Sequence, residues 1–186
     1  PWTNIDFYDE LKLTQWADKK HKKLEKRVLK EADVCISVGE TLSGELTDLG
    51  ADKCVTITNG YDDSDIVETD IQLDSKISIA HIGSFTKSRN PELLLNALGR
   101  LKKKFPDLSS KIELKLVGKV DYTITELINR YDVTDLVRKI EYLPHAKEMI
   151  EQRKQHVLLS IVNDNQTANA LLTGTSFQFL PANTPI

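Results

Sequence analysis

The chain has 186 residues, 40% of them hydrophobic, and a formal net charge of -3 at pH 7. This composition excludes a disordered chain, and no apolar run approaches the roughly 20 residues that a membrane-spanning helix needs. Because its start lacks the charged, apolar and small-residue pattern of a signal peptide, we expect a soluble, cytoplasmic protein.

Helices and strands alternate along the first third of the chain. The hydrophobic pattern predicts a long helix over residues 1–33 and a second helix that is closed by Gly50. Short apolar runs on either side of the second helix predict strands at residues 34–38 and 54–60. The following acidic stretch, residues 61–75, has few apolar clusters and is typical of a connector.

The alternating pattern restarts at residue 77. The predicted strands are 77–83, 112–118, 140–143 and 157–162, and the predicted helices are 90–104, 121–131, 134–138, 146–155 and 173–182. Strands that alternate with helices imply right-handed crossovers and a parallel sheet. The run at 157–162 is apolar on both faces, as in a central strand covered by helices. The predicted fold class is therefore α/β, a Rossmann-like parallel sheet with helices on both faces.

Two α/β domains are expected. We assign residues 1–66 to the end of a first domain, residues 67–76 to a connector and residues 77–186 to a second domain. The first predicted helix has no preceding strand on which to pack, and the last residues stop where another strand would begin. We therefore expect the chain to be a fragment of a longer protein.

The junction ISIAHIGSFTKSRNPELLLNAL, residues 77–98, leads from a strand through a polar loop into a helix. Gly83 permits a tight turn or a close approach of the backbone, and the Asn-Pro pair suits the start of a helix. With Lys87 and Arg89, the free N–H groups of that helix would form an anion site suited to phosphate. The alternative is that both cations are solvated loop residues.

Other ligand sites have less support. The chain has neither a P-loop segment nor a G-x-G-x-x-G turn after a strand, which argues against ordinary nucleotide hydrolysis and dinucleotide binding. Its four histidines are scattered and lack partners at metal-ligand spacing, so no metal site is predicted. Cys35 and Cys54 lie in apolar runs, where buried reduced thiols are favoured over a disulfide.

A basic run, KKHKKLEKR, lies in the first predicted helix, whose cations extend from Lys19 to Lys30. Such a run would attract the anionic inner face of a membrane. Its charges are expected to spread around several helical faces with few large apolar residues, which favours a solvated helix over peripheral membrane association. Nucleic acid is not an expected partner, because the net charge is negative and no aromatic residues interleave the run.

The order of these segments resembles that of the GT-B glycosyltransferases, most of all the retaining, family-4-type enzymes. EADVCISVGETLSGELTDLGADKCVTITNGYD resembles the end of their first domain, and IAHIGSFTKSRNPELLLNAL resembles the opening of their nucleotide-sugar-binding domain. LKLVG, IEYLPHAKEMIEQRKQHVLLSIV and GTSFQFLPANTPI follow in the family's order. The resemblance covers nearly the whole chain. It implies transfer of a sugar from a nucleotide-diphosphate donor to a glycan, lipid or other acceptor, in glycan or polysaccharide biosynthesis.

The resemblance also implies where the donor binds. Its diphosphate would lie on the loop of Gly83, Ser84, Lys87 and Arg89, in which Arg89 replaces the usual lysine and Ser84 stands where many members carry an arginine. The nucleotide base and ribose would contact Gly118, Lys119, Leu143, His145 and Gln178. For Gly118 and His145 an ordinary turn role is the alternative. No cofactor and no metal ion is implied, since cations and the helix dipole would stabilise the phosphates.

The segment GTSFQFLPANTPI departs from the family pattern. Family members have a Glu that holds the ribose and another acidic residue eight positions earlier, near the transferred sugar. This chain has Gln178 and Ala170 at those positions, and Thr175 where a Lys is usual. These departures favour one alternative, a non-catalytic sugar-nucleotide-binding or scaffolding module. A GT-B nucleotide-sugar epimerase is a further alternative, and the fragment alone is expected to be inactive.

Overall fold

The computed structural model describes residues 2–5, 8, 11–66, 70–85, 90–161 and 174–186. These residues form two compact units that divide between Asn59 and Gly60. The described residues up to 59 are called the first unit, and those from 60 onward the second unit. The division falls inside the segment assigned to the first domain, and the assignment of residues 67–76 as the connector stays a prediction.

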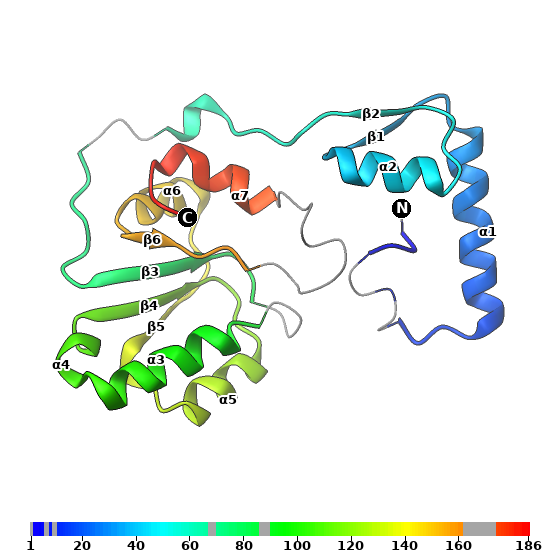
Figure 1. Cartoon of the computed structure of the whole chain (residues 1–186). Helices are drawn as coiled ribbons and strands as arrows, with labels where there is room; N and C mark the ends of the chain where they lie inside the picture. Colours follow the sequence, from blue (N-terminus) through cyan, green and yellow to red (C-terminus); the bar gives the residue numbers. More distant parts are fainter. Residues whose placement is uncertain (1, 6–7, 9–10, 67–69, 86–89, 162–173) are drawn as a thin grey trace. The chain divides into compact units, whose positions relative to one another are not determined.

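The first unit contains two helices and a parallel pair of strands (Figure 1). Its elements are α1 (Gln15–Glu31), β1 (Cys35–Ser37), α2 (Glu40–Asp48) and β2 (Cys54–Thr56). A small core of Leu29, Leu46 and Ala51 joins them. Cys35 lies opposite Cys54 in the strand pair, and both are free thiols as predicted. Both side chains are half-buried, so the prediction that they are buried is wrong.

Helix α1 begins later than predicted. Thr14 has an extended backbone, and its hydroxyl accepts a hydrogen bond from Ala17 N (3.3 Å), which satisfies one of the free N–H groups of the first turn. Lys12 has a positive φ of 47°, which interrupts a helical backbone. The predicted helix is therefore wrong for the described residues before Gln15.

The second unit is a four-stranded parallel sheet with helices on both faces (Figure 1). Its strands are β3 (Ile77–Ile82), β4 (Ile112–Val117), β5 (Val137–Ile140) and β6 (Val157–Leu158), in the order β5-β4-β3-β6. Its helices are α3 (Glu92–Lys104), α4 (Pro106–Ser109), α5 (Tyr122–Arg130), α6 (His145–Arg153) and α7 (Gly174–Phe179), and its 3-10 turns are η2 (Asp63–Asp65), η3 (Thr134–Leu136) and η5 (Leu180–Ala182). The predicted α/β fold class is confirmed.

Each face of this sheet has its own apolar core. On one face, Leu114 and Leu116 of β4 pack with residues of α3 and α5, and we call this the first core. On the other face, Val117 packs with Leu158 and with Phe179 of α7, and we call this the second core. Side chains alternate along β4, so Leu114 and Leu116 lie on one face and Val117 lies on the other. Because each fully buried aliphatic side chain contributes about 1.5–3 kcal/mol to stability, this alternation determines which helices cover each face.

Two strands differ from their predicted ranges. β5 ends where the predicted strand 140–143 begins, because turn η3 closes at Leu136 and the chain is extended from Val137. β6 is shorter than the predicted strand 157–162. It pairs with β3 on one side, and on the other Leu158 N donates to Pro185 O (2.7 Å). Its two apolar faces are explained by the cores, because Leu158 lies in the second core while Leu159 and Ile161 pack against the first.

Chain order and sheet order diverge between β3 and β6. β3, β4 and β5 follow one another toward one side of the sheet, whereas β6 pairs with the opposite edge of β3. In open α/β sheets, ligands bind beyond the carboxyl ends of the strands at such a switch point. The boundary between β3 and β6 is therefore the place to look for a ligand site.

Candidate functional site

The turns after β3 and β4 meet at the carboxyl edge of the sheet. Gly83 and Gly118 have positive φ values of 143° and 114°, a conformation that residues with a side chain rarely adopt. A Cβ atom on Gly118 would lie only 2.4 Å from the carbonyl oxygen of Gly83. The two backbones approach this closely because Gly118 has no side chain, and the tight turn predicted at Gly83 is present.

Hydrogen bonds extend the β3–β4 pairing into these turns. Gly83 N donates to Val117 O (2.9 Å), and Phe85 N donates to Lys119 O (2.8 Å). The Phe85 side chain is 2% exposed and lies in the first core, whereas Ser84 and Lys119 are exposed. The inner side of the loop is therefore fixed by backbone bonds, and its outer side presents polar residues to solvent.

Helix α3 follows this loop and brings its free N–H groups to the same edge. The helix begins at Glu92, two residues after its predicted start, with Pro91 as its cap, and Asn90 Oδ1 accepts a hydrogen bond from Glu92 N (2.8 Å). The Glu92 carboxylate accepts a hydrogen bond from the Tyr131 hydroxyl (2.7 Å), which raises the pKa of Tyr131 above 10.0. A helix start of this kind favours an anion. The two cations predicted beside it lie outside the described residues: Lys87 and Arg89.

The β5–α6 loop carries two of the predicted base contacts. Leu143 is half-buried and packs against the second core. His145 is the first residue of α6, and its Nε2 lies 2.6 Å from Asp65 Oδ1. Asp65 belongs to turn η2, 80 residues earlier in the chain, and no sequence pattern indicated this pair. This contact holds η2 to the start of α6.

Helix α7 carries Gln178, the predicted ribose contact. Its neighbour Phe179 is 1% exposed in the second core, whereas Gln178 is exposed. Burial of Phe179 therefore anchors α7 on the sheet and leaves Gln178 at the helix surface. Ala170 and the side chain of Thr175 lie outside the described residues.

Two buried basic side chains were missed in the sequence. His81 is 4% exposed near the end of β3, and Lys115 is 3% exposed in the middle of β4. Each lies between two apolar neighbours in its strand, and that position was the available signal, because a buried basic group needs a specific partner. Within the described ranges, no group of three or more His, Cys, Asp or Glu side chains is placed to hold a metal ion.

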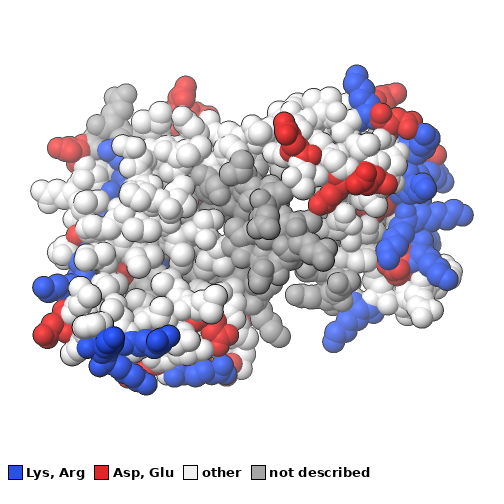
Figure 2. All heavy atoms as spheres, viewed as in Figure 1, with Lys and Arg blue, Asp and Glu red and all other residues white. Residues whose placement is uncertain are grey.

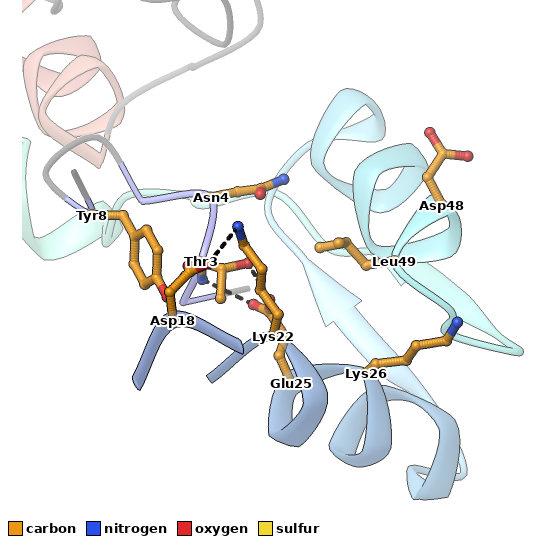
Figure 3. Close-up of a pocket in the computed structure, with 9 residues that line it drawn as sticks. All are labelled: Thr3, Asn4, Tyr8, Asp18, Lys22, Glu25, Lys26, Asp48 and Leu49. Atoms are coloured by element: carbon orange, nitrogen blue, oxygen red, sulfur yellow. Dashed lines mark hydrogen bonds and ion pairs between the residues drawn. The ribbon is translucent and has the colours of Figure 1, made fainter. Parts of the chain in front are cut away.

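The first unit contains a cavity lined by α1, the chain before it and the end of α2 (Figure 3). Glu25 is 1% exposed and accepts hydrogen bonds from the backbone N (3.0 Å) and the hydroxyl of Thr3. Asp18 accepts hydrogen bonds from Lys22 (3.0 Å) and Tyr8 (3.1 Å), which hold its pKa below 3.8. These groups bond to one another across the cavity, so they serve to hold α1 against the preceding chain.

Lys and Arg side chains gather over α1 (Figure 2). With 3.6 residues per turn, the seven cations between Lys19 and Lys30 occupy an arc of about 160°, so the predicted spread around several faces is wrong. Trp16 is 70% exposed, with Lys20 Nζ 4.9 Å from its ring. Three of the cations are ion-paired: Lys22 with Asp18, Arg27 with Glu31, and Lys30 with Asp52. In the part of the chain that the structure describes, no helix is long and apolar enough to cross a bilayer.

No protein-family model and no curated protein sequence matches the chain. Among solved structures, trehalose-6-phosphate synthase OtsA matches with a TM-score of 0.71 and 11% identity, over 91% of this chain and 48% of the synthase. HepE from Anabaena, solved in complex with UDP, matches with a TM-score of 0.67 and 11% identity, over 90% of this chain and 48% of HepE. Sucrose-phosphate synthase from Thermosynechococcus elongatus matches with a TM-score of 0.59 and 17% identity, over 78% of this chain and 39% of the synthase.

The likeness to these proteins is one of fold. The chain spans less than half the length of each of the three. The predicted resemblance to GT-B proteins is confirmed at this level, since the parallel sheets flanked by helices match over most of the chain.

Proposed function

We propose that the intact protein is a retaining GT-B glycosyltransferase. It would transfer a sugar from a nucleotide-diphosphate donor to a glycan, lipid or other acceptor, in glycan or polysaccharide biosynthesis. The observation that carries the proposal is the close pair of turns at Gly83 and Gly118, which lies at the carboxyl edge of a fold shared with the UDP complex of HepE. This edge is where open α/β sheets bind nucleotides.

In this proposal the diphosphate lies against the Gly83 turn and the first turn of α3. Lys87 and Arg89 supply positive charge, and Arg89 offers a fork of donors that matches phosphate oxygens. The base and ribose contact the predicted positions Gly118, Lys119, Leu143, His145 and Gln178. Because backbone N–H groups and cations neutralise the phosphates, neither a cofactor nor a metal ion is required.

The two alternatives predict different products. A non-catalytic module binds the donor and leaves it intact, whereas an epimerase changes the donor sugar without an acceptor. The similar solved structures favour transfer, since two are named as synthases and the third was solved with UDP. The neutral residues Ala170 and Gln178 favour the non-catalytic module. Incubation of the full-length protein with labelled donor and acceptor separates the three functions by where the label ends.

Replacement of Arg89 by alanine is expected to weaken nucleoside-diphosphate binding about 10- to 150-fold, because a charge-assisted hydrogen bond of about 1.5–3 kcal/mol is lost. Isothermal titration of the wild type and Arg89→Ala with UDP, GDP and ADP measures the change. Arg100→Ala is the matched control, since Arg100 is exposed on α3 away from its first turn. Equal affinities of wild type and Arg89→Ala would contradict the phosphate assignment.

In EDTA the affinity of the wild-type protein for the nucleoside diphosphate is expected to be unchanged. A loss of affinity that Mg²⁺ or Mn²⁺ restores would show a metal-dependent site instead.

We also propose a cytoplasmic location, with α1 as a solvated helix. The ion pairs of Lys22, Arg27 and Lys30 neutralise part of the positive charge of α1, which favours a solvated helix over a membrane-bound one. Peripheral association of Lys19–Lys30 with the inner face of a membrane is the alternative, and the exposed Trp16 on the same helix is the observation that supports it. Sedimentation with anionic phosphatidylglycerol vesicles, compared with neutral ones, distinguishes the two.

A further inference from the structure

His81 links the ends of β3 and β6 at the switch point of the sheet. Its side chain is 4% exposed, and its Nδ1 lies 2.8 Å from the carbonyl oxygen of Leu159, the first residue after β6. A carbonyl oxygen only accepts hydrogen bonds, so Nδ1 carries the hydrogen and donates it. Leu159 N donates in turn to Ala80 O (2.7 Å). The end of β6 is therefore held to β3 by one backbone bond and one imidazole bond.

The same imidazole also packs against the Gly83 turn. Its ring lies 4.1 Å from the Phe85 ring, measured between centroids, at an angle of 54°. A Cβ atom on Gly83 would lie 3.4 Å from His81 Nε2, so the Nε2 edge of the ring is against the turn. Phe85 is itself bonded through its backbone to the loop after β4. One side chain thus contacts the turn after β3 and the end of β6, which are the two sides of the switch point.

We propose that His81 is a positioning residue for the nucleotide donor. By holding the Gly83 turn at a set distance from the end of β6, it keeps the backbone that lines the proposed diphosphate site in one arrangement, and binding then costs less ordering of the loop. This inference rests on the proposed function for the role of the turn. The placement of the turn itself depends only on contacts within the protein.

A hydrogen bond and a ring contact make separable contributions at this position. His81→Phe keeps an aromatic ring against Phe85 and removes the donor to Leu159. His81→Asn removes the ring and keeps an N–H donor on the atom next to Cγ, where His81 has Nδ1. If the hydrogen bond positions the turn, the variant that keeps the N–H donor, His81→Asn, has the higher nucleotide affinity. The variant that keeps the packed ring, His81→Phe, has the higher thermal stability.

The decisive experiment compares these variants with His156→Phe. His156 lies at the opposite, amino-terminal end of β6 and also uses its Nδ1, which is 3.2 Å from Ser78 N. We expect UDP, GDP or ADP to bind His81→Phe roughly three- to tenfold more weakly than wild type, the equivalent of one ordinary hydrogen bond. His81→Asn is expected to bind more tightly than His81→Phe despite a lower melting temperature. His156→Phe is expected to keep wild-type affinity.

A second readout needs no nucleotide. By NMR, the amides of Gly83 and Phe85 are expected to exchange with solvent faster in His81→Phe than in wild type, and to be partly restored in His81→Asn. Wild-type exchange in His81→Phe, or an equal loss of affinity in His156→Phe, would overturn the positioning role. If wild type binds no nucleotide, the proposed function fails while the exchange rates still decide whether His81 holds the turn.

Discussion

Replacing Gly118 by alanine is expected to destabilise the second unit by about 3 kcal/mol and to abolish nucleotide binding. The φ of 114° at this position is unfavourable for any residue with a side chain, by about 1–3 kcal/mol. In addition, the new Cβ would lie 2.4 Å from the carbonyl oxygen of Gly83, so backbone must move. Since that movement displaces the turn proposed to cradle the diphosphate, stability and binding are lost together. Urea unfolding and calorimetric titration measure the two effects.

Gly60→Ala is the matched control for this substitution. Gly60 also belongs to the second unit, and nothing lies within 4 Å of a Cβ atom built on it. The same chemical change there is expected to alter the free energy of unfolding by less than about 1 kcal/mol and to leave binding intact. A Gly118→Ala protein as stable as the Gly60→Ala protein would show that the two turns do not meet as described.

Local patterns in the sequence were sufficient for most of the fold. The alternation of short apolar runs with amphipathic segments indicates β3, β4 and α3 within one or two residues, because burial on one or two faces leaves a direct periodic trace. Gly83 was identifiable for the same reason, since a glycine at the end of an apolar strand marks a turn. β5 was misplaced because its exposed Arg138 and Lys139 conceal the strand, whose pairing with β4 is what fixes it.

Pairs formed by residues far apart in the chain could not be predicted in this way. Asp65 and His145 are separated by 80 residues, and the sequence around neither residue indicates the other as its partner. The start of α1 likewise depends on one hydroxyl, that of Thr14, which caps the helix. Because the residues on both sides of Thr14 favour a helix, the sequence pattern does not show that the helix begins there. At the candidate site, sequence indicates the residue types at strand ends, whereas the contact of the Gly83 and Gly118 backbones follows only from the paired strands.

A buried ion network inside the second unit is a consequence of such long-range pairing. Lys115 Nζ donates to Asp74 Oδ2 (2.5 Å), just before β3, and to Glu151 Oε1 (2.8 Å) on α6. The Lys115 side chain is 4% exposed, and those of Asp74 and Glu151 are 25% and 13% exposed. Burial by itself lowers the pKa of Lys115, but the hydrogen bonds to both carboxylates outweigh it, so the pKa is raised above 10.5.

Replacement of Lys115 by methionine is therefore expected to destabilise the second unit by about 3–5 kcal/mol at pH 7, because two largely buried carboxylates lose their shared cation. Lys102→Met is the matched control: its Nζ also bonds two acids, Asp132 and Asp135, but at the surface, where solvent and salt screen the pairs. Its effect on urea unfolding is expected to be far smaller.

The pKa of Lys115 is higher in the folded protein than its ordinary value of 10.5, so the charged lysine stabilises the fold fully at every pH below 10.5. The difference in unfolding free energy between wild type and Lys115→Met should therefore persist up to pH 10.5 and shrink only as the pH rises through the raised pKa. Equal losses from both substitutions, or a difference that already shrinks near neutral pH, would contradict a buried, charged Lys115.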